Sequence, residues 1–219
     1  MTSHHQHDVS DVELDSDNDV VIGPFFAALA GKLADPELIS TLHERHDALR
    51  QPAQHDEDGP TATNAAVATA LLAAEQTLTS AVPDRGQRRD LLEQALVEPL
   101  AAITRQTTQA ALDEAEDPFA TMVATTRDRE THAFGRRFVF DHPVDSDTEF
   151  ISQVRHCYFH ELLTAHEAGH LTSILCAFDA NWMDAVDPTR HGFTVDRATT
   201  IATGGSSCPF RFRRNELES

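Results

Sequence analysis

The spacing of the apolar residues changes near residue 131, and this change limits the fold more than any other feature. Before it, apolar residues recur at helical spacing, and Pro36 and Pro83 interrupt the pattern. Proline is tolerated in the first turn of a helix but not in its interior. We therefore expect separate helices at 24–34, 36–49, 61–82, 85–114 and 117–127.

After residue 131 the segments are shorter and richer in β-branched and aromatic residues. Strands are expected at 133–141, 149–156, 193–203 and 208–214, and helices at 157–166 and 173–186. This order predicts an α+β fold, in which an N-terminal helical subdomain packs with a small antiparallel sheet that carries two inserted helices. The predicted divisions are a disordered acidic tail (1–20), the helical subdomain (21–130) and an α+β domain (131–219) that holds the functional site.

The charge balance excludes several partners. Acidic residues number 36 against 17 basic ones, which gives a formal net charge of −19. Such a chain is repelled by nucleic acids and by anionic membranes. Lys32 is the single lysine, a bias expected either from a salt-rich cytoplasm or from a GC-rich genome. The partner we expect is a small-molecule substrate, and no feature of the sequence indicates an oligomeric state.

The first residues and the apolar runs bear on localisation. No apolar run approaches the roughly 20 residues that span a bilayer. The stretch 1–19 has no apolar region of the kind found in secretory signals, so we expect a cytoplasmic protein. His4, His5 and His7 lie in this acidic stretch, where a metal-binding role is the minority interpretation.

All three cysteines lie in the last third of the chain, at Cys157, Cys176 and Cys208. An odd number of cysteines in a protein that is not exported argues against a disulfide framework. Free cysteines are also among the most buried residue types, so packing is an alternative role for each of them.

A short motif, His166-Glu167-Ala168-Gly169-His170, matches the H-E-x-x-H pattern of zinc metallopeptidases. On a helix this spacing places both imidazoles on one face to bind zinc, with Glu167 as the general base. Asp179 or Asp184 would then supply the third ligand. Thirteen histidines make a chance match less surprising, and a cluster at a helix end is the competing interpretation.

A longer series of residues spreads over 150–214. It contains a cysteine followed by Glu161, then Cys176-x-x-Asp179, and then a segment with Arg197, Thr200, Gly204 and Cys208 that ends in Phe210-Arg211-Phe212. This series resembles the L-2-amino-thiazoline-4-carboxylic acid hydrolase family. The sequence departs from that pattern at Ala198 and Pro209, and 188–197 is longer than usual.

The resemblance implies hydrolysis of a carbon–nitrogen bond in a small cyclic amidine. Such chemistry needs a nucleophile, a proton carrier and a cation for the substrate carboxylate. We expect the catalytic set to be Cys157, Glu161, Cys176, Asp179 and Cys208. We expect substrate binding by Arg197, Thr200, Gly204 and Arg211, with the two arginines as a carboxylate clamp.

The local pattern also suggests how the thiols would act. Cys157 precedes a predicted helix, whose N-terminal dipole would favour its thiolate. Cys208 follows a Gly-Gly-Ser-Ser turn, where backbone N–H groups can face a developing charge. No cofactor is predicted. The alternatives are zinc, either in the peptidase motif or in a site of three cysteines with a fourth ligand, and a non-catalytic small-molecule or thiol sensor.

Overall fold

The computed structural model describes residues 16–50 and 58–215. The predicted tail lies outside this range up to residue 15, and residues 16–20 belong to the first helix. Five helices form the first half: α1 (Ser16–Leu33), α2 (Pro36–Leu49), α3 (Gly59–Leu78), α4 (Arg85–Glu114) and α5 (Pro118–Arg129). The prediction for 85–114 and that for 36–49 are confirmed, whereas Pro24 lies inside α1 rather than opening a helix.

Aspartates set the starts of these helices. Asp35, Asp58, Asp84 and Asp117 each accept a hydrogen bond from a backbone N–H group of the first turn. This satisfies donors that have no partner within the helix. In α2, α3 and α5 a proline follows within the first two positions, where its missing N–H group costs nothing.

The second half holds the sheet and several short helices. Its elements are η2 (Glu130–Phe134), β1 (Val139–Asp141), β2 (Glu149–His156), α6 (Tyr158–Ala165), η3 (Gly169–Leu171), α7 (Thr172–Asp179), η4 (Met183–Ala185), α8 (Pro188–His191), β3 (Phe193–Asp196), η5 (Ile201–Thr203) and β4 (Cys208–Arg214). The four strands are antiparallel in the order β1-β2-β4-β3. The α+β class is therefore confirmed, together with strands 149–156 and 208–214.

Three predicted elements are shorter than expected, each for a local reason. The strand predicted at 133–141 begins only at Val139, because η2 runs to Phe134 and Gly135 turns the chain with φ +75°. The helix predicted at 173–186 ends at Asp179 and is followed by η4. The strand predicted at 193–203 ends at Asp196, after which the chain turns into η5.

The inner face of the sheet carries the core of this half. Phe150 pairs with Phe212, Ser152 with Phe210, and Val154 with Cys208 across β2 and β4. All six side chains are buried. Because side chains alternate along a strand, Arg211 and Arg213 fall on the exposed face.

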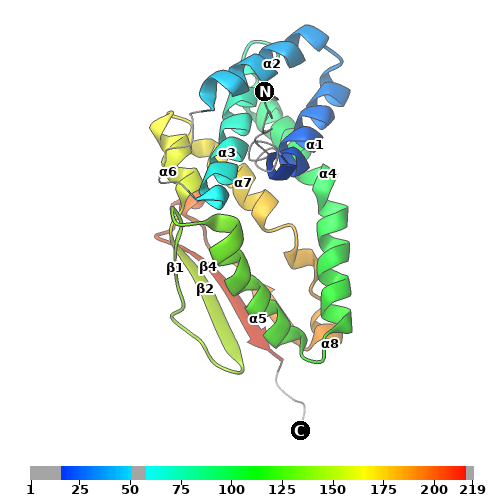
Figure 1. Ribbon diagram of the computed structural model, residues 1–219, viewed down its shortest axis with the longest axis vertical. Helices are drawn as coiled ribbons and strands as arrows, with labels where there is room; N and C mark the ends of the chain where they lie inside the picture. Colours follow the sequence, from blue (N-terminus) through cyan, green and yellow to red (C-terminus); the bar gives the residue numbers. More distant parts are fainter. Residues whose placement is uncertain (1–15, 51–57, 216–219) are drawn as a thin grey trace, which may run out of the picture.

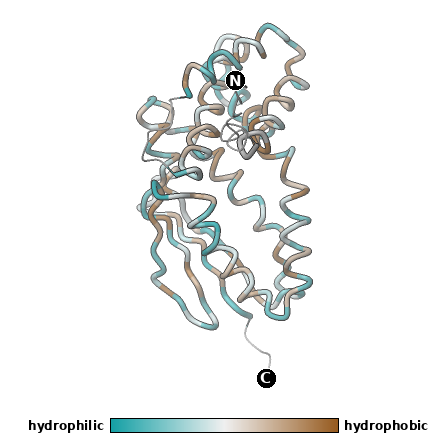
Figure 2. The backbone as a smooth tube through the Cα atoms, in the orientation of Figure 1, coloured by the Kyte–Doolittle hydropathy of each residue, from teal (hydrophilic) through white to brown (hydrophobic). Residues whose placement is uncertain are grey.

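The helices pack against this sheet and share one hydrophobic core with it. Helix α5 lies alongside the sheet and runs in nearly the same direction as β2 and β4, and the long α4 runs along the opposite side of the molecule (Figure 1). Phe119 of α5 packs edge-on against Phe193 of β3, with ring centroids 5.9 Å apart. Hydrophobic residues occur on helices and strands alike (Figure 2), and one buried cluster draws on both halves of the chain. The predicted boundary at residue 130 therefore falls within a continuous core.

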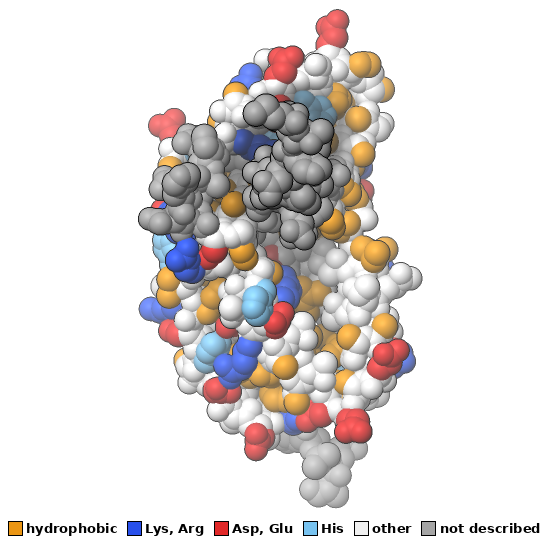
Figure 3. Space-filling model, viewed as in Figure 1, with side chains coloured by type: hydrophobic (Ala, Val, Ile, Leu, Met, Phe, Trp, Pro, Cys, Tyr) orange, Lys and Arg blue, Asp and Glu red, His pale blue; other side chains and the backbone are white. Residues whose placement is uncertain are grey.

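Charged side chains of both signs are interspersed over the face seen in Figure 3. Within the described ranges, no helix combines the length and the apolar composition that crossing a membrane requires.

Gly135 and Gly192 allow a matched test of the turn before β1. Gly192 is left-handed, with φ +72° and ψ +16°, where an L residue costs roughly 1–2 kcal/mol, whereas Gly135 combines φ +75° with ψ −176°, a region essentially restricted to glycine. A Cβ at Gly192 would meet nothing, whereas one at Gly135 would lie 2.5 Å from Asp58 Oδ1 and 2.9 Å from Thr61 N. We expect Gly192→Ala to lower the free energy of unfolding by about 1 kcal/mol, and Gly135→Ala by at least about twice as much. Urea unfolding measures both, and equal losses would contradict the close approach at Gly135.

Candidate functional site

The three cysteines come from three different elements and lie close enough to influence one another electrostatically. Cys157 precedes α6, Cys176 lies in α7 and Cys208 begins β4. Each thiol contributes to the electrostatic environment of the others: Cys176 and Cys208 both act on Cys157, and Cys208 acts on Cys176. All three are free thiols, as the odd count predicts, and we call them the thiol cluster.

Burial decides the protonation of the thiol cluster. It raises the pKa of Cys157 to about 12, although the backbone N–H groups of His160 and Phe159 oppose the shift. It also raises the pKa of Cys176 to about 11, against the lowering effect of the Arg197 charge. The expectation that the helix dipole favours the Cys157 thiolate is therefore wrong for the unliganded protein, in which desolvation prevails.

Cys208 has the most enclosed thiol, and its side chain is 5% exposed. Burial raises its pKa, while the N–H group of Ile201 donates to its sulfur over 3.1 Å and opposes that rise. This donor belongs to η5 rather than to the predicted Gly-Gly-Ser-Ser turn. Thr200 caps η5 and donates a hydrogen bond toward Cys176, and Gly204 closes the turn with φ +90°.

Arg197 and Asp179 lie directly behind the cluster. Arg197 donates from Nη2 to the carbonyl oxygen of Cys176 over 3.0 Å, and its Nη1 lies 3.9 Å from Asp179 Oδ2. Its guanidinium also stacks over Phe210, 4.9 Å from the ring centroid. The side chain of Arg197 thus reaches α7 and is 13% exposed, which makes it less accessible to a substrate carboxylate than Arg155, whose side chain is 48% exposed.

Arg211 lies away from the thiol cluster, whereas Glu161 lies on α6 close to Cys157. Arg211 points to the outer face of β4, where its Nε lies 3.2 Å from Glu149 Oε1. Glu161 accepts from Arg137 Nη2 over 2.6 Å, and its Oε2 lies 2.8 Å from His156 Nε2. Burial opposes ionisation of Glu161, but His156 and Arg137 outweigh it and lower its pKa. Glu161 is therefore held as a carboxylate by its two partners.

A groove of about 420 Å³ opens beside Cys157. It is bounded by α6 on one side and by the turn after η5 on the other, and its lining includes Arg155, Cys157, His160, Glu161 and Ser206. Within the described part of the chain, Arg155 has one ion pair, with Asp141 at 3.6 Å. The groove therefore combines a thiol, a histidine, a carboxylate and a weakly paired arginine.

The peptidase motif does not lie on a single helix. Helix α6 ends at Ala165, so the motif lies in the turn between α6 and α7. Glu167 has φ +58°, and His170 Nε2 lies 3.6 Å from Glu75 Oε1. The basis for that alternative, two imidazoles on one face of a helix, is thus absent. No group of three or more His, Cys, Asp or Glu side chains within residues 16–50 and 58–215 is placed to hold a metal ion, the thiol cluster included.

The structure also places residues near Asp179 that the sequence analysis missed. Arg129 Nη2 donates to Asp179 Oδ1 over 3.1 Å. Glu130 accepts from Ser152 over 2.5 Å, and its Oε2 lies 2.9 Å from His142 Nε2. The available signal was Ser152 itself, a lone hydroxyl on the buried face of a strand otherwise lined by apolar residues, which requires a partner.

The raised thiol pKa values predict a loss of stability at alkaline pH. An unfolded thiol loses its proton near pH 8.5, whereas the folded protein holds the protons of Cys157 and Cys176 to about pH 12 and 11. The free energy of unfolding should therefore fall as pH rises from about 8.5 through this window. The chain has one lysine and one tyrosine, so few other side chains titrate there. Urea unfolding across this range should give a shallower slope for Cys157→Ala than for the wild type; identical slopes would contradict the burial of that thiol.

Comparisons with solved structures give only weak likenesses. The H-NOX protein from K. algicida, in its unliganded Fe(II) form, is 9% identical, with 90% of this chain and 98% of that chain covered and a TM-score of 0.35. The H-NOX protein from S. oneidensis, in the Fe(II)NO ligation state, is 12% identical, with 89% and 99% covered and a TM-score of 0.31. These likenesses are too weak to support an argument about this chain.

No curated protein matches the sequence. A family model does match, described as L-2-amino-thiazoline-4-carboxylic acid hydrolase, over residues 63–212. The match covers about two-thirds of the chain and extends from α3 into β4, well beyond the segment 150–214 that carried the resemblance. It includes every member of the thiol cluster together with Arg197 and Asp179. The chain therefore belongs to the L-2-amino-thiazoline-4-carboxylic acid hydrolase family.

Proposed function

We propose that the protein hydrolyses a carbon–nitrogen bond of a small cyclic amidine, such as an aminothiazoline carboxylate, in the groove beside Cys157. The observation that supports this most directly is the thiol cluster. Three elements distant in sequence bring three cysteines together, and one of these cysteines lines a groove with His160 and Glu161. A nucleophile beside groups that can move protons is what such a hydrolysis requires.

The protonated thiol fits an amidine substrate. Cyclic amidines are bases and enter a site as amidinium cations. A cation within about 4–6 Å favours the thiolate over the thiol, so a bound amidinium would lower the pKa of Cys157. The empty site would stay unreactive, and the substrate itself would create the nucleophile.

The reaction then proceeds in two steps. The Cys157 sulfur bonds to the amidine carbon while the ring carbon–nitrogen bond breaks, and the nitrogen leaves as an amine after receiving a proton. Water next adds to the same carbon and displaces the Cys157 thiolate, giving an S-carbamoyl product. Glu161 and His160 are the groove residues that would carry these protons.

Arg155 is the candidate for holding the substrate carboxylate. It lines the groove, and its pairing with Asp141 at 3.6 Å is loose. Arg197, the residue expected from the sequence, is instead committed to Cys176 and Asp179. A guanidinium is well suited to a carboxylate because it donates two parallel hydrogen bonds.

The direct test is a mass-spectrometric turnover assay on L-2-amino-thiazoline-4-carboxylate at low and high salt. We expect carbamoyl-cysteine from the wild type and a loss of more than about 100-fold in kcat for Cys157→Ser, because serine is the weaker nucleophile. Circular dichroism would verify that the variant folds. Turnover of Cys157→Ser at the wild-type rate would exclude Cys157 as the nucleophile. If the wild-type protein formed no product at either salt concentration, L-2-amino-thiazoline-4-carboxylate would be excluded as the substrate.

Matched substitutions of Arg155 and Arg211 test which arginine binds the substrate carboxylate. Losing a charge-assisted hydrogen bond costs about 1.5–3 kcal/mol, so Arg155→Met should raise KM roughly ten- to hundredfold with less effect on kcat. Arg211→Met removes the same charge from the outer face of the sheet and should leave KM unchanged. Steady-state kinetics on both variants decides this, and equal effects would contradict the assignment of Arg155.

A further inference from the structure

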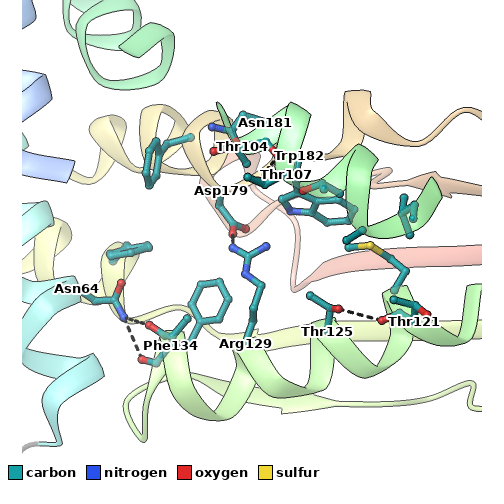
Figure 4. Close-up of a pocket in the computed structure, with 17 residues that line it drawn as sticks. Asn64, Thr104, Thr107, Thr121, Thr125, Arg129, Phe134, Asp179, Asn181 and Trp182 are labelled. Atoms are coloured by element: carbon teal, nitrogen blue, oxygen red, sulfur yellow. Dashed lines mark hydrogen bonds and ion pairs between the residues drawn. The ribbon is translucent and has the colours of Figure 1, made fainter. Parts of the chain in front are cut away.

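A second cavity, of about 470 Å³, lies between α4, α5 and the segment from α7 to η4 (Figure 4). No cysteine lines it, so it is separate from the groove beside Cys157. Its size is in the range of pockets that enclose small organic molecules. We call it the α4–α5 pocket.

The body of the α4–α5 pocket is apolar and aromatic. Leu112, Met122, Phe134, Phe159 and Phe178 line it. Threonines also line it, and two of them use their hydroxyl donors within their own helices: Thr107 donates to Ile103 O and Thr125 to Thr121 O. The amide nitrogen of Asn64 is likewise used by backbone carbonyl groups. These walls suit an apolar ligand.

The polar capacity of the pocket is concentrated at one end. There Arg129, Asp179, Asn181 and Trp182 lie close together (Figure 4). Arg129 makes a single hydrogen bond to a described residue, from Nη2 to Asp179, which leaves Nε and Nη1 available. Trp182 is 5% exposed and lines the pocket, and its indole N–H group donates to no described residue. This donor is therefore open to an acceptor on a ligand.

Two arginines and two carboxylates meet at this end. Asp179 is shared between Arg129 and Arg197. The carboxylate of Glu130 lines the adjoining smaller space, where Ser152 and His142 occupy its oxygens. A ligand carboxylate would be held by the unused donors of Arg129 and by Trp182, rather than by an excess of positive charge.

We propose that the α4–α5 pocket binds a small carboxylate with an apolar body, seated on Arg129 and Trp182. This goes beyond the proposed hydrolysis, because it assigns a separate binding site whose ligand does not react. The apolar body would replace water along the phenylalanine wall, and the carboxylate would complete the hydrogen bonds of the two donors.

Trp182 is the only tryptophan of the chain, so its fluorescence reports on this pocket alone. Phenylbutyrate is a suitable probe, and phenylbutyramide is its uncharged match. We expect phenylbutyrate to change the fluorescence of the wild-type protein in a saturable way, and the amide to bind at least tenfold more weakly. No saturable change, or equal affinity for both compounds, would overturn the proposal.

Two arginine variants locate the binding. Arg129→Met removes the donors and keeps an apolar stem, and it should weaken phenylbutyrate binding at least tenfold. Arg105→Met removes an exposed charge from α4 and should leave the affinity unchanged. Unaltered binding by Arg129→Met would place the probe elsewhere. The assay measures binding without turnover, so its outcome is independent of whether Cys157 hydrolyses an amidine.

Discussion

The pairing of β2 with β4 is the constraint on which the rest of the structure depends. Its register sets Val154 opposite Cys208 and Phe150 opposite Phe212, and so decides which side chains face the helices. A slip of one residue would bring Arg211 inward and turn Cys208 outward. On the inner face Trp182 stacks on Phe212, with ring centroids 6.0 Å apart and planes 6° from parallel. The strand pairing therefore positions both the thiol cluster and one wall of the α4–α5 pocket.

Asp179 connects these two regions. Arg129 approaches it from α5 and Arg197 from the segment after β3. The two arginines pair with a carboxylate that is 18% exposed, and they tie α7 to elements distant in sequence. Cys176 lies on the same short helix, so the position of Asp179 also fixes a member of the cluster. A hydrolytic centre and a separate binding pocket would thus share one charged residue.

Much of the fold could be predicted from local sequence signals, and the site only in part. Helix 85–114 was predictable because Asp84 caps it and apolar residues recur along it, and strand 208–214 because its residues alternate. The start of the strand expected at 133–141 could not be predicted, because the turn at Gly135 packs closely against Asp58, a residue distant in sequence. The family pattern pointed to the cysteines, Arg197 and Asp179. Arg129 and Trp182 belong to no motif, and only the tertiary fold brings them together.

The central claim is that the thiols of the three cysteines, which are buried or partly buried, stay protonated until substrate arrives. The most direct measurement is the ultraviolet absorbance of thiolate in the unliganded protein as a function of pH, compared with the same chain in denaturant. The account predicts that the denatured chain titrates near pH 8.5, while the native protein shows almost no thiolate until well above that pH. A thiolate already present near neutral pH in the native protein would contradict it.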